Sequence, residues 1–337
     1  MSAHFKKIIG IGSPIMDLLV HVDDDFLLKN VTGSKGGMEL VEAELLEMIT
    51  GIISNTPIKE APGGSAANTI FALTRMQGSC AFLGKLGSDL TGNQYQEVFR
   101  GLGGDCTRFK VTLDAPTAQC LSMVTPDSER TMRTCLGAAA LLSPDEITPD
   151  SFIGYDHAHL EGYLLFNPAL IEKVLSEAKN AGLTISLDLG SFEVVKASAN
   201  ILPALLEKYV DIVFANEEEA AAYAGDHDPQ AGLDALSEVC EIAAVKLGAD
   251  GAFIHHNGRK HRIKAVKAAK VIDTTGAGDY WAAGFLHGYS RGMSSDLCGH
   301  AGSILGAAVV AHLGADLPEN VWQQVISQIS QLENMWR

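Results

Sequence analysis

One short segment of the 337-residue sequence combines residue types suited to chemistry on a phosphate: Asp273-Thr274-Thr275-Gly276-Ala277-Gly278-Asp279. Gly276 and Gly278 have no side chain, so a ligand can approach the backbone closely. If a helix follows, the amides from Thr275 to Gly278 lack intrahelical partners and form an anion pocket. A carboxylate there would repel a phosphate unless it removes a proton from an attacking hydroxyl, so Asp279 is predicted to be a general base for phosphoryl transfer. The alternative is an aspartate that only caps a helix after a glycine turn.

The residues on either side of this segment predict the elements that hold it. Lys270 to Ile272 precede it and are expected to end a short strand. Trp281, Phe285 and Tyr289 recur every four residues after it, which is typical of a helix over Tyr280 to Arg291. The chemistry is therefore expected at a turn between a strand and a helix.

Predicted strands and helices alternate along most of the chain. Strands are expected at 7–11, 80–86, 157–160, 184–187, 212–215 and 243–247, followed by a hairpin around Asn257-Gly258. Helices are expected at 42–53, 89–101, 169–181, 199–209, 217–224, 232–239, 298–312 and 320–333, with a further helix that ends at Met76. Alternation at this spacing predicts an α/β fold, with a mainly parallel sheet and helices on both of its faces.

Two β-rich pieces, at about 15–38 and 118–136, do not fit this alternation. The second is typical of a hairpin, with strands at 118–124 and 130–136 and a turn at 125–129. We expect the two pieces to form a small second sheet, placed as a lid. Because neither a repeat nor a low-complexity linker divides the sequence, residues 1–337 are predicted to be a single domain.

The net charge of the chain limits the classes of molecule that it is expected to bind. With 25 basic and 41 acidic residues the formal net charge is −16, which disfavours nucleic acids and anionic membranes. A nucleotide would then need local positive charge from a helix N-terminus, a metal ion or a few cations. No apolar run reaches about 18 residues, so no membrane span is expected. Six cysteines without a C-x-x-C pair are typical of reduced thiols in a cytoplasmic protein.

The Asp-Thr-Thr-Gly-Ala-Gly-Asp segment, followed by a helix of small residues, resembles the C-terminal signature of the ribokinase-like (PfkB) carbohydrate and nucleoside kinases. Gly63-Gly64-Ser65-Ala66-Ala67-Asn68 resembles their N-terminal signature, and the resemblance extends from Ile8 to about Pro318. It implies a three-layer α/β/α fold with a mostly parallel central sheet and a small β-sheet lid. It also implies ATP and Mg²⁺ as cofactors, with a monovalent cation such as K⁺ in some members.

The resemblance assigns residues to the phosphoryl acceptor. Asp17 matches an early aspartate that accepts hydrogen bonds from a ribose diol, although an early aspartate is otherwise usually a turn residue. Family members use the glycines and the asparagine of the N-terminal signature on sugar hydroxyls. The expected acceptor-binding residues are Asp17, Met38, Gly63, Gly64, Asn68 and Glu161.

The resemblance also assigns residues to the nucleotide and the metal. Asn216 and Glu219 match an Asn-x-x-Glu element that organises Mg²⁺ through water, although Asn216 would also suit a helix N-cap. Lys246 stands in a strand and glycine turn that lines the nucleotide, where many relatives have threonine. The expected nucleotide-binding residues are Asn216, Lys246, Gly248, Gly251, Thr275 and Gly314, and the catalytic set is Gly276, Ala277, Gly278 and Asp279.

The acceptor is predicted from the finer pattern. Ser65-Ala66 stand where ribokinase has Lys-Gly, and Lys35-Gly36-Gly37-Met38, Arg130-Thr131-Met132-Arg133 and Glu161-Gly162-Tyr163 look like the bacterial adenosine-kinase-like branch. We therefore expect transfer to a primary hydroxyl of a small molecule, best assigned as the 5′-hydroxyl of adenosine or a related ribonucleoside, by a monomer or homodimer. The alternatives are a kinase for free ribose or fructose and a catalytically silent nucleoside-binding regulator.

Two other functional readings find less support. A nicotinamide dehydrogenase would need a complete Gly-x-Gly-x-x-Gly after the first strand, and only Gly10 and Gly12 are present. His157 and His159 would face the same side of a strand, but no third metal ligand is evident, so they are predicted to be core or solvated histidines.

Overall fold

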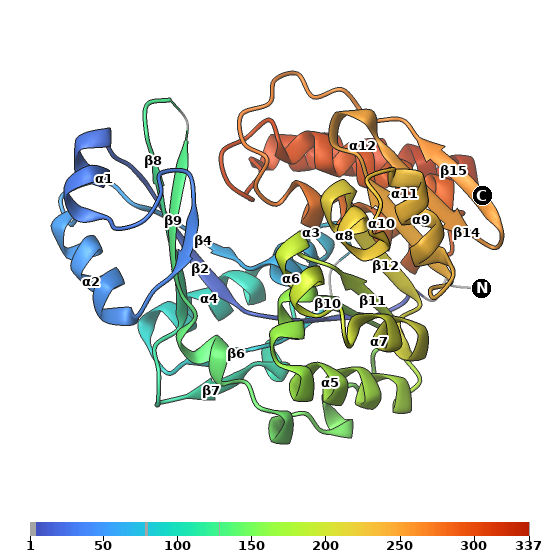
Figure 1. Ribbon diagram of the computed structural model, residues 1–337, viewed down its shortest axis with the longest axis horizontal. Helices are drawn as coiled ribbons and strands as arrows, with labels where there is room; N and C mark the ends of the chain where they lie inside the picture. Colours follow the sequence, from blue (N-terminus) through green and yellow to red (C-terminus); the bar gives the residue numbers. More distant parts are fainter. Residues whose placement is uncertain (1–4, 78–79, 128, 337) are drawn as a thin grey trace.

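The computed structural model describes residues 5–77, 80–127 and 129–336, in which an eight-stranded sheet organises the larger of two lobes (Figure 1). Its strand order is β15-β14-β13-β12-β11-β10-β1-β5. The pairings of β14 with β13 and with β15 are antiparallel, and the others are parallel. The strands are β1 (Ile8–Ile11), β5 (Ala81–Leu83), β10 (His157–Glu161), β11 (Thr184–Asp188), β12 (Ile212–Asn216), β13 (Ile242–Lys246), β14 (Ala252–His256) and β15 (Arg259–Ile263).

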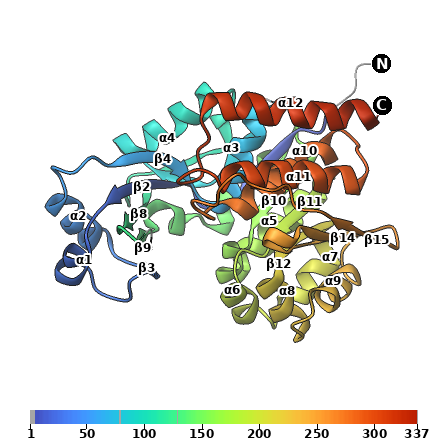
Figure 2. The same ribbon diagram turned by 90° about the horizontal axis from the view of Figure 1, so that it is seen from above.

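Helices cover both faces of this sheet (Figure 2). One face carries α3 (Ser65–Gln77), α10 (Ala277–Ser290), α11 (Ser295–Val309) and α12 (Glu319–Trp336), and the other carries α5 (Pro168–Asn180), α6 (Phe192–Ala197), α7 (Leu202–Tyr209), α8 (Glu217–Ala224) and α9 (Pro229–Ser237). Neighbouring strand residues alternate between two hydrophobic clusters: Ile8 and Phe214 belong to one, Ile9 and Val213 to the other. The central strands are apolar throughout because both of their faces are buried.

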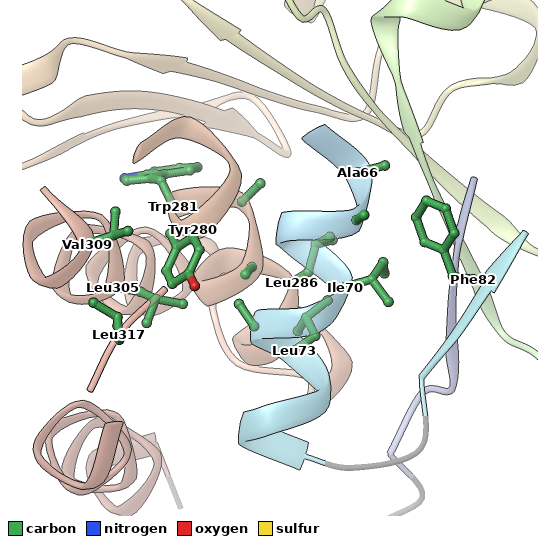
Figure 3. Close-up of a cluster of buried hydrophobic side chains, with 14 of the residues drawn as sticks. Ala66, Ile70, Leu73, Phe82, Tyr280, Trp281, Leu286, Leu305, Val309 and Leu317 are labelled. Atoms are coloured by element: carbon green, nitrogen blue, oxygen red, sulfur yellow. The ribbon is translucent and has the colours of Figure 1, made fainter. Parts of the chain in front are cut away.

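Helix α10 lies deepest in the first layer. Ten of its residues are buried, as expected for a helix that is apolar all round. A Cβ atom on Gly284 would lie 2.4 Å from the Ala301 carbonyl oxygen, so α10 and α11 approach backbone to backbone. On its other side α10 packs against α3, whose Ile70 points toward Phe82 of β5 (Figure 3). This packing fixes the start of α10 relative to α3.

The smaller lobe is a five-stranded sheet of order β3-β9-β8-β2-β4. Its strands are β2 (Ile15–His21), β3 (Met38–Leu40), β4 (Lys59–Gly63), β8 (Ala118–Val124) and β9 (Arg130–Cys135), and it carries α1 (Asp24–Asn30) and α2 (Ala43–Ile52). Helix α4 (Leu90–Gly101) and a two-stranded sheet of β6 (Lys85–Gly87) and β7 (Lys110–Thr112) lie beside it. Short 3-10 turns occur at 106–108, 137–141, 144–146, 149–151, 162–166 and 248–250.

The predicted fold class is confirmed: a mostly parallel sheet between two helical layers, with a small β-sheet lid. The hairpin of β8 and β9 pairs antiparallel as expected, and Ser128 of its predicted turn lies outside the described residues. Among the described residues, no helix is both long and apolar enough to cross a lipid bilayer.

The predicted strand at 270–272 is wrong. These residues form no strand, and Val271 and Ile272 are 63% and 46% exposed. The Ile272 amide donates to the Val310 carbonyl, 2.8 Å away at the end of α11, instead of to a neighbouring strand. The segment before the glycine turn is therefore an extended surface loop held by a helix end.

Three other element predictions need correction. The strand expected at 80–86 is divided into β5 and β6, which belong to different sheets, and a Cβ atom on Gly84 between them would lie 2.6 Å from the Gly12 carbonyl oxygen. The helix expected at 199–209 begins at Leu202, with proline in its first turn, and α6 precedes it. Strand β4 was missed because it contains Pro62, which an edge strand tolerates.

Candidate active site

Polar side chains collect where the parallel strands end. Glu161, Asp188, Asn216 and Lys246 are the last residues of β10, β11, β12 and β13, four neighbours in the sheet. The register pairs Glu161 with Asp188 and Asn216 with Lys246. Because the carboxyl ends of parallel strands share one edge, these side chains converge, as ligand sites in open α/β sheets do.

The glycine segment forms the start of α10 beside this edge. Gly276 is the N-cap with φ 73°, a left-handed conformation that favours glycine, and Gly278 lies in the first turn. Two loop amides already have partners: that of Thr275 donates to Asp273 Oδ1 over 3.0 Å, and that of Ala277 to the Thr274 carbonyl over 3.1 Å. The segment is thus a preformed loop at a helix N-terminus.

Asp279 in the first turn of α10 is held by the other glycine turn. Ser65 Oγ donates to its Oδ1 over 2.8 Å, and Asn68 Nδ2 donates to its Oδ2 over 2.9 Å. Thr69 Oγ1 donates to its backbone carbonyl over 3.0 Å. Burial raises the pKa of Asp279 to about 6 and the Asp188 charge adds to this, while the bonds from Asn68 and Ser65 oppose it. The carboxylate is fixed in orientation and remains titratable near neutral pH.

Lys246 forms an ion pair with a residue that sequence reasoning missed. Its Nζ lies 2.7 Å from Oδ2 of Asp188, and both side chains are largely buried. A Cβ atom on Gly278 would lie 3.0 Å from the same Nζ, so the ammonium borders the glycine loop. Asp188 carried a usable signal, since it directly follows the predicted strand 184–187.

Asn216 and Glu219 form a reciprocal cap at the start of α8. The Glu219 amide donates to Asn216 Oδ1 over 2.8 Å, and the Asn216 amide and Nδ2 donate to the two Glu219 carboxylate oxygens over 2.8 and 2.7 Å. Glu219 is buried, and its pKa rises to about 7 through burial and the Asp188 charge. The helix-cap interpretation therefore holds, and the cap also turns a buried carboxylate toward the site.

A cleft lies between the lid sheet and the loops around α10 and α11, with about 420 Å³ of empty space that includes open solvent at its mouth. Its walls include Asp17, Leu19, Ala61, Pro62, Ser122 and Arg130 from the lid, and Thr275 and Leu313 to Asp316 from the larger lobe. Burial raises the pKa of Asp17 to about 7, and the charge of Arg130 opposes this rise. The predicted acceptor residue therefore faces the cleft together with predicted nucleotide residues.

Two ion pairs join the lid to the larger lobe across this cleft. Arg130 Nη2 lies 3.2 Å from Asp273 Oδ2, and its Nη1 donates to Thr275 Oγ1. Lys59 Nζ lies 3.3 Å from Asp316 Oδ2 at the more exposed rim. Sequence reasoning gave no role to Arg130, although the strand Arg130-Thr131-Met132-Arg133 formed part of the resemblance.

The predicted glycines are explained mainly by close packing. A Cβ atom on Gly63 would lie 2.3 Å from Asp17 Oδ2, and one on Gly64, at φ 103°, would lie 2.1 Å from the Ser13 carbonyl oxygen. One on Gly251 would lie 1.9 Å from the Ile263 carbonyl oxygen, whereas one on Gly248 would meet nothing within 4 Å. The Gly314 amide donates to Asp273 Oδ2 over 2.7 Å, so it braces the loop before α10.

Of the six predicted acceptor residues, Asp17 lines the cleft, and the other five are not among its lining residues: Met38, Gly63, Gly64, Asn68 and Glu161. Glu161 is 2% exposed and accepts hydrogen bonds from the amides of Ser13 and Ala66 over 2.9 and 3.1 Å. Its carboxylate ties the turn after β1 to the start of α3. Met38 is half-exposed on the edge strand β3.

His157 and His159 lie inside the sheet layer, 0% and 1% exposed. Ser186 Oγ is shared between His157 Nε2 and His159 Nδ1, at 2.8 and 2.9 Å, and Thr184 Oγ1 lies 2.8 Å from His157 Nδ1. Burial lowers the pKa of both rings. They are buried histidines joined to hydroxyl groups.

The sequence matches a family of enzymes. Residues 48–322 match the pfkB family of carbohydrate kinases. An uncharacterized sugar kinase of Archaeoglobus fulgidus is 30% identical over 261 residues, which cover 74% of this chain and 99% of that protein.

Solved structures agree over nearly the whole chain. The adenosine kinase of Sinorhizobium meliloti superposes with a TM-score of 0.83 at 32% identity, covering 96% of this chain and 99% of that one. A probable sugar kinase of Rhizobium etli gives 0.84 at 30% identity, with coverage of 98% and 99%.

Proposed function

This chain belongs to the pfkB family of carbohydrate kinases and is a sugar or nucleoside kinase, and we propose that it transfers the γ-phosphoryl group of ATP to the 5′-hydroxyl of adenosine or a related ribonucleoside. The observation that carries this proposal is Asp279. A partly buried carboxylate with a pKa of about 6 stands at a helix N-terminus, oriented by Ser65 and Asn68 from a second glycine turn. A general base that works near neutral pH needs this combination of a fixed position and a pKa close to neutral.

Asp279 takes the proton from the acceptor hydroxyl as the hydroxyl oxygen attacks the γ-phosphorus. The bond from phosphorus to the bridging oxygen breaks, and its electron pair leaves with ADP. The products are the phosphorylated acceptor, ADP and a proton. Backbone amides of Gly276 and Gly278, at the start of α10, would stabilise the charge on the transferring group, whereas the Ala277 amide donates to the Thr274 carbonyl and would have to leave it to take part.

Asn216 and Glu219 suit a magnesium ion bound through water. No group of three or more His, Cys, Asp or Glu side chains within the described ranges could hold a metal ion directly. Mg²⁺ keeps several of its waters in nucleotide sites, so the side-chain oxygens of Glu219, Asn216 and Asp188 would accept hydrogen bonds from that water shell. When bound, the ion neutralises charge on the phosphates.

Asp17 is proposed to hold the acceptor diol. Asp17 lines the cleft, and its carboxylate lies close to Gly63, where a Cβ atom would stand 2.3 Å from Oδ2. A carboxylate can accept from two vicinal hydroxyls at once. Asn68 and Gly64 lie between Asp17 and Asp279 in the chain of contacts, which would place a primary hydroxyl near the base. The similarity to a bacterial adenosine kinase favours a nucleoside.

A free-sugar kinase is the second candidate. Two of the similar proteins are described as sugar kinases, at 30% identity each. The same Asp279 chemistry would serve a ribose or fructose hydroxyl. A catalytically silent regulator is disfavoured because a pure binder has no need of a partly buried base at a phosphate loop.

ADP release from Mg-ATP tests the proposal with a panel of adenosine, inosine, guanosine, cytidine, ribose, fructose and fructose-6-phosphate. Turnover with one nucleoside would support the proposal. Turnover only with a sugar would retain the mechanism and replace the acceptor. If a nucleoside raises the melting temperature while no acceptor is turned over, the silent-regulator reading replaces the enzyme.

A further inference from the structure

The ammonium of Lys246 lies between a carboxylate and the glycine loop. Nζ donates to Asp188 Oδ2 over 2.7 Å, and a Cβ atom on Gly278 would lie 3.0 Å from it. Lys246 reaches this position from β13 across the end of β12, since Asp188 ends β11. The absence of a side chain at position 278 thus keeps a cation in contact with the loop that precedes the proposed base.

The surroundings of this ammonium are strongly acidic. Asp188 and Glu219 are buried around it and Asp279 is partly buried, and the Lys246 charge opposes the rise in pKa of both Glu219 and Asp279. Burial acts to lower the pKa of Lys246, but Asp188 and Glu219 outweigh it and the pKa is raised. Lys246 therefore stays protonated at neutral pH and acts as a fixed positive charge.

The ammonium also has unused donors. An ammonium carries three N–H groups, and in the described part of the chain Lys246 has one hydrogen-bond acceptor, Asp188. Lys179, at the opposite edge of the same sheet, is bound by both oxygens of Asp211 at 2.7 and 2.6 Å. Asp211 also accepts from the Ile185 amide over 2.6 Å, so that pair is closed on itself. The Lys246 pair is open on the side of the loop.

We propose that Lys246 is a catalytic residue that contacts an oxygen of the phosphoryl group in transfer, and that Asp188 is the positioning residue that holds its ammonium against the glycine loop. This inference rests on the proposed kinase function and adds a protein-borne cation to it. Lys246 neither gives nor takes a proton: Asp279 receives the hydroxyl proton, ADP keeps the electron pair of the broken bond, and the ammonium stabilises the charge on the group between them.

The competing explanation is that Lys246 only neutralises Asp188. Removing one partner of a buried ion pair leaves an unpaired charge, whereas removing both together is often tolerated. Variants Lys246→Met, Asp188→Asn and the double variant therefore separate the two explanations. Lys179→Met is the matched control, because it breaks the Lys–Asp pair between the end of α5 and the residue before β12, at the opposite end of the strands from the glycine loop.

The primary measurement is steady-state turnover with the acceptor on which the wild type is active. We expect Lys246→Met to lower kcat roughly 10²- to 10³-fold, the range for removing one transition-state donor, with little change in KM for the acceptor. The double variant should stay as low as Lys246→Met, and Lys179→Met should keep wild-type kcat. Wild-type turnover in Lys246→Met, or recovery of kcat to within a few-fold in the double variant, overturns the inference.

A binding measurement makes the test independent of turnover. Aluminium fluoride with Mg-ADP imitates the planar phosphoryl group. Titration calorimetry should show that aluminium fluoride tightens Mg-ADP binding to the wild type, tightens it less in Asp188→Asn, where the ammonium is no longer held, and does not tighten it in Lys246→Met. Equal tightening in Lys246→Met overturns the inference and leaves the kinase function intact. A wild type that shows neither tightening nor turnover overturns the kinase function, and the inference with it.

Discussion

A Lys–Asp ion pair lies at each end of the parallel strands of the eight-stranded sheet, and the two pairs differ in their surroundings. We call these two ends the carboxyl edge and the amino edge. At the carboxyl edge, Lys246 pairs with Asp188 at 2.7 Å; at the amino edge, Lys179 pairs with Asp211 at 2.6 Å. The amino-edge pair is partly exposed and ties the end of α5 to the starts of β11 and β12. The carboxyl-edge pair is more deeply buried and borders a helix N-terminus.

The difference lies in what surrounds each pair. At the carboxyl edge Glu219 is buried and Asp279 is partly buried nearby, and burial with the Asp188 charge raises the pKa values of both. Such shifts mean that keeping these two carboxylates ionised costs the folded protein stability, which is typical of functional sites. The position of a Lys–Asp pair at the carboxyl or the amino edge is thus more informative about function than the identity of its residues. Four predictions compare the two edges.

The largest effect is expected from Asp279→Asn. Losing a positioned base should lower kcat roughly 10²- to 10⁴-fold with little change in ATP affinity, because asparagine keeps the shape and cannot take the proton. Asp211→Asn at the amino edge should weaken stability and leave kcat intact. Steady-state kinetics with ATP titration measures both, and near-normal turnover in Asp279→Asn would remove that residue from the role of base.

Gly64→Ala, at the carboxyl edge, should lower the free energy of unfolding far more than Gly182→Ala, at the amino edge. Both glycines have positive φ, 103° and 83°, but a Cβ atom would lie 2.1 Å from the Ser13 carbonyl oxygen at position 64 and meet nothing within 4 Å at position 182. We expect losses of about 3–5 kcal/mol and about 1–2 kcal/mol in the free energy of unfolding. Urea unfolding compares them, and equal losses would contradict the close contact.

Asp17→Ala should raise KM for the acceptor roughly 10- to 100-fold and leave KM for ATP nearly unchanged, since charge-assisted hydrogen bonds to a diol would be lost. Asp156→Ala is the amino-edge control: its carboxylate accepts from the Lys7 amide over 2.8 Å, before β10 begins. Kinetics with each substrate varied in turn provides the measurement. Equal effects of Asp17→Ala on both KM values would argue against an acceptor contact.

The smallest effect concerns pH. Asp279 must be ionised to act as the base and Asp17 must be ionised to hold the diol, so kcat/KM for the acceptor should rise with pH through about 6 to about 7 and level off above that. Because the Asp188 charge raises the pKa of Asp279, Asp188→Asn should move this acid limb to lower pH. Asp211→Asn should leave the limb in place. A pH profile from 4.5 to 8.5, a range of about four units around that pKa, detects the shift, and an unmoved limb in Asp188→Asn would contradict it.

The periodicity of the sequence was sufficient for the central sheet and most of its helices, because apolar strands and amphipathic helices are local patterns. The prediction of a strand at 270–272 failed because the apolar residues there lie on the surface, held by the end of α11. Strand β4 was missed because its proline is tolerated only at a sheet edge, and edge position depends on tertiary pairing.

The sequence by itself determined the α/β class, the family and the two glycine turns, because these follow from short segments with strong local constraints. Only the tertiary structure brought Ser65 and Asn68 to Asp279, 214 and 211 residues away along the chain. It also decided that Asp188 pairs with Lys246 and that Arg130 reaches Asp273. These contacts join side chains from separate strands and lobes, and their pKa values depend on burial, which no local pattern specifies.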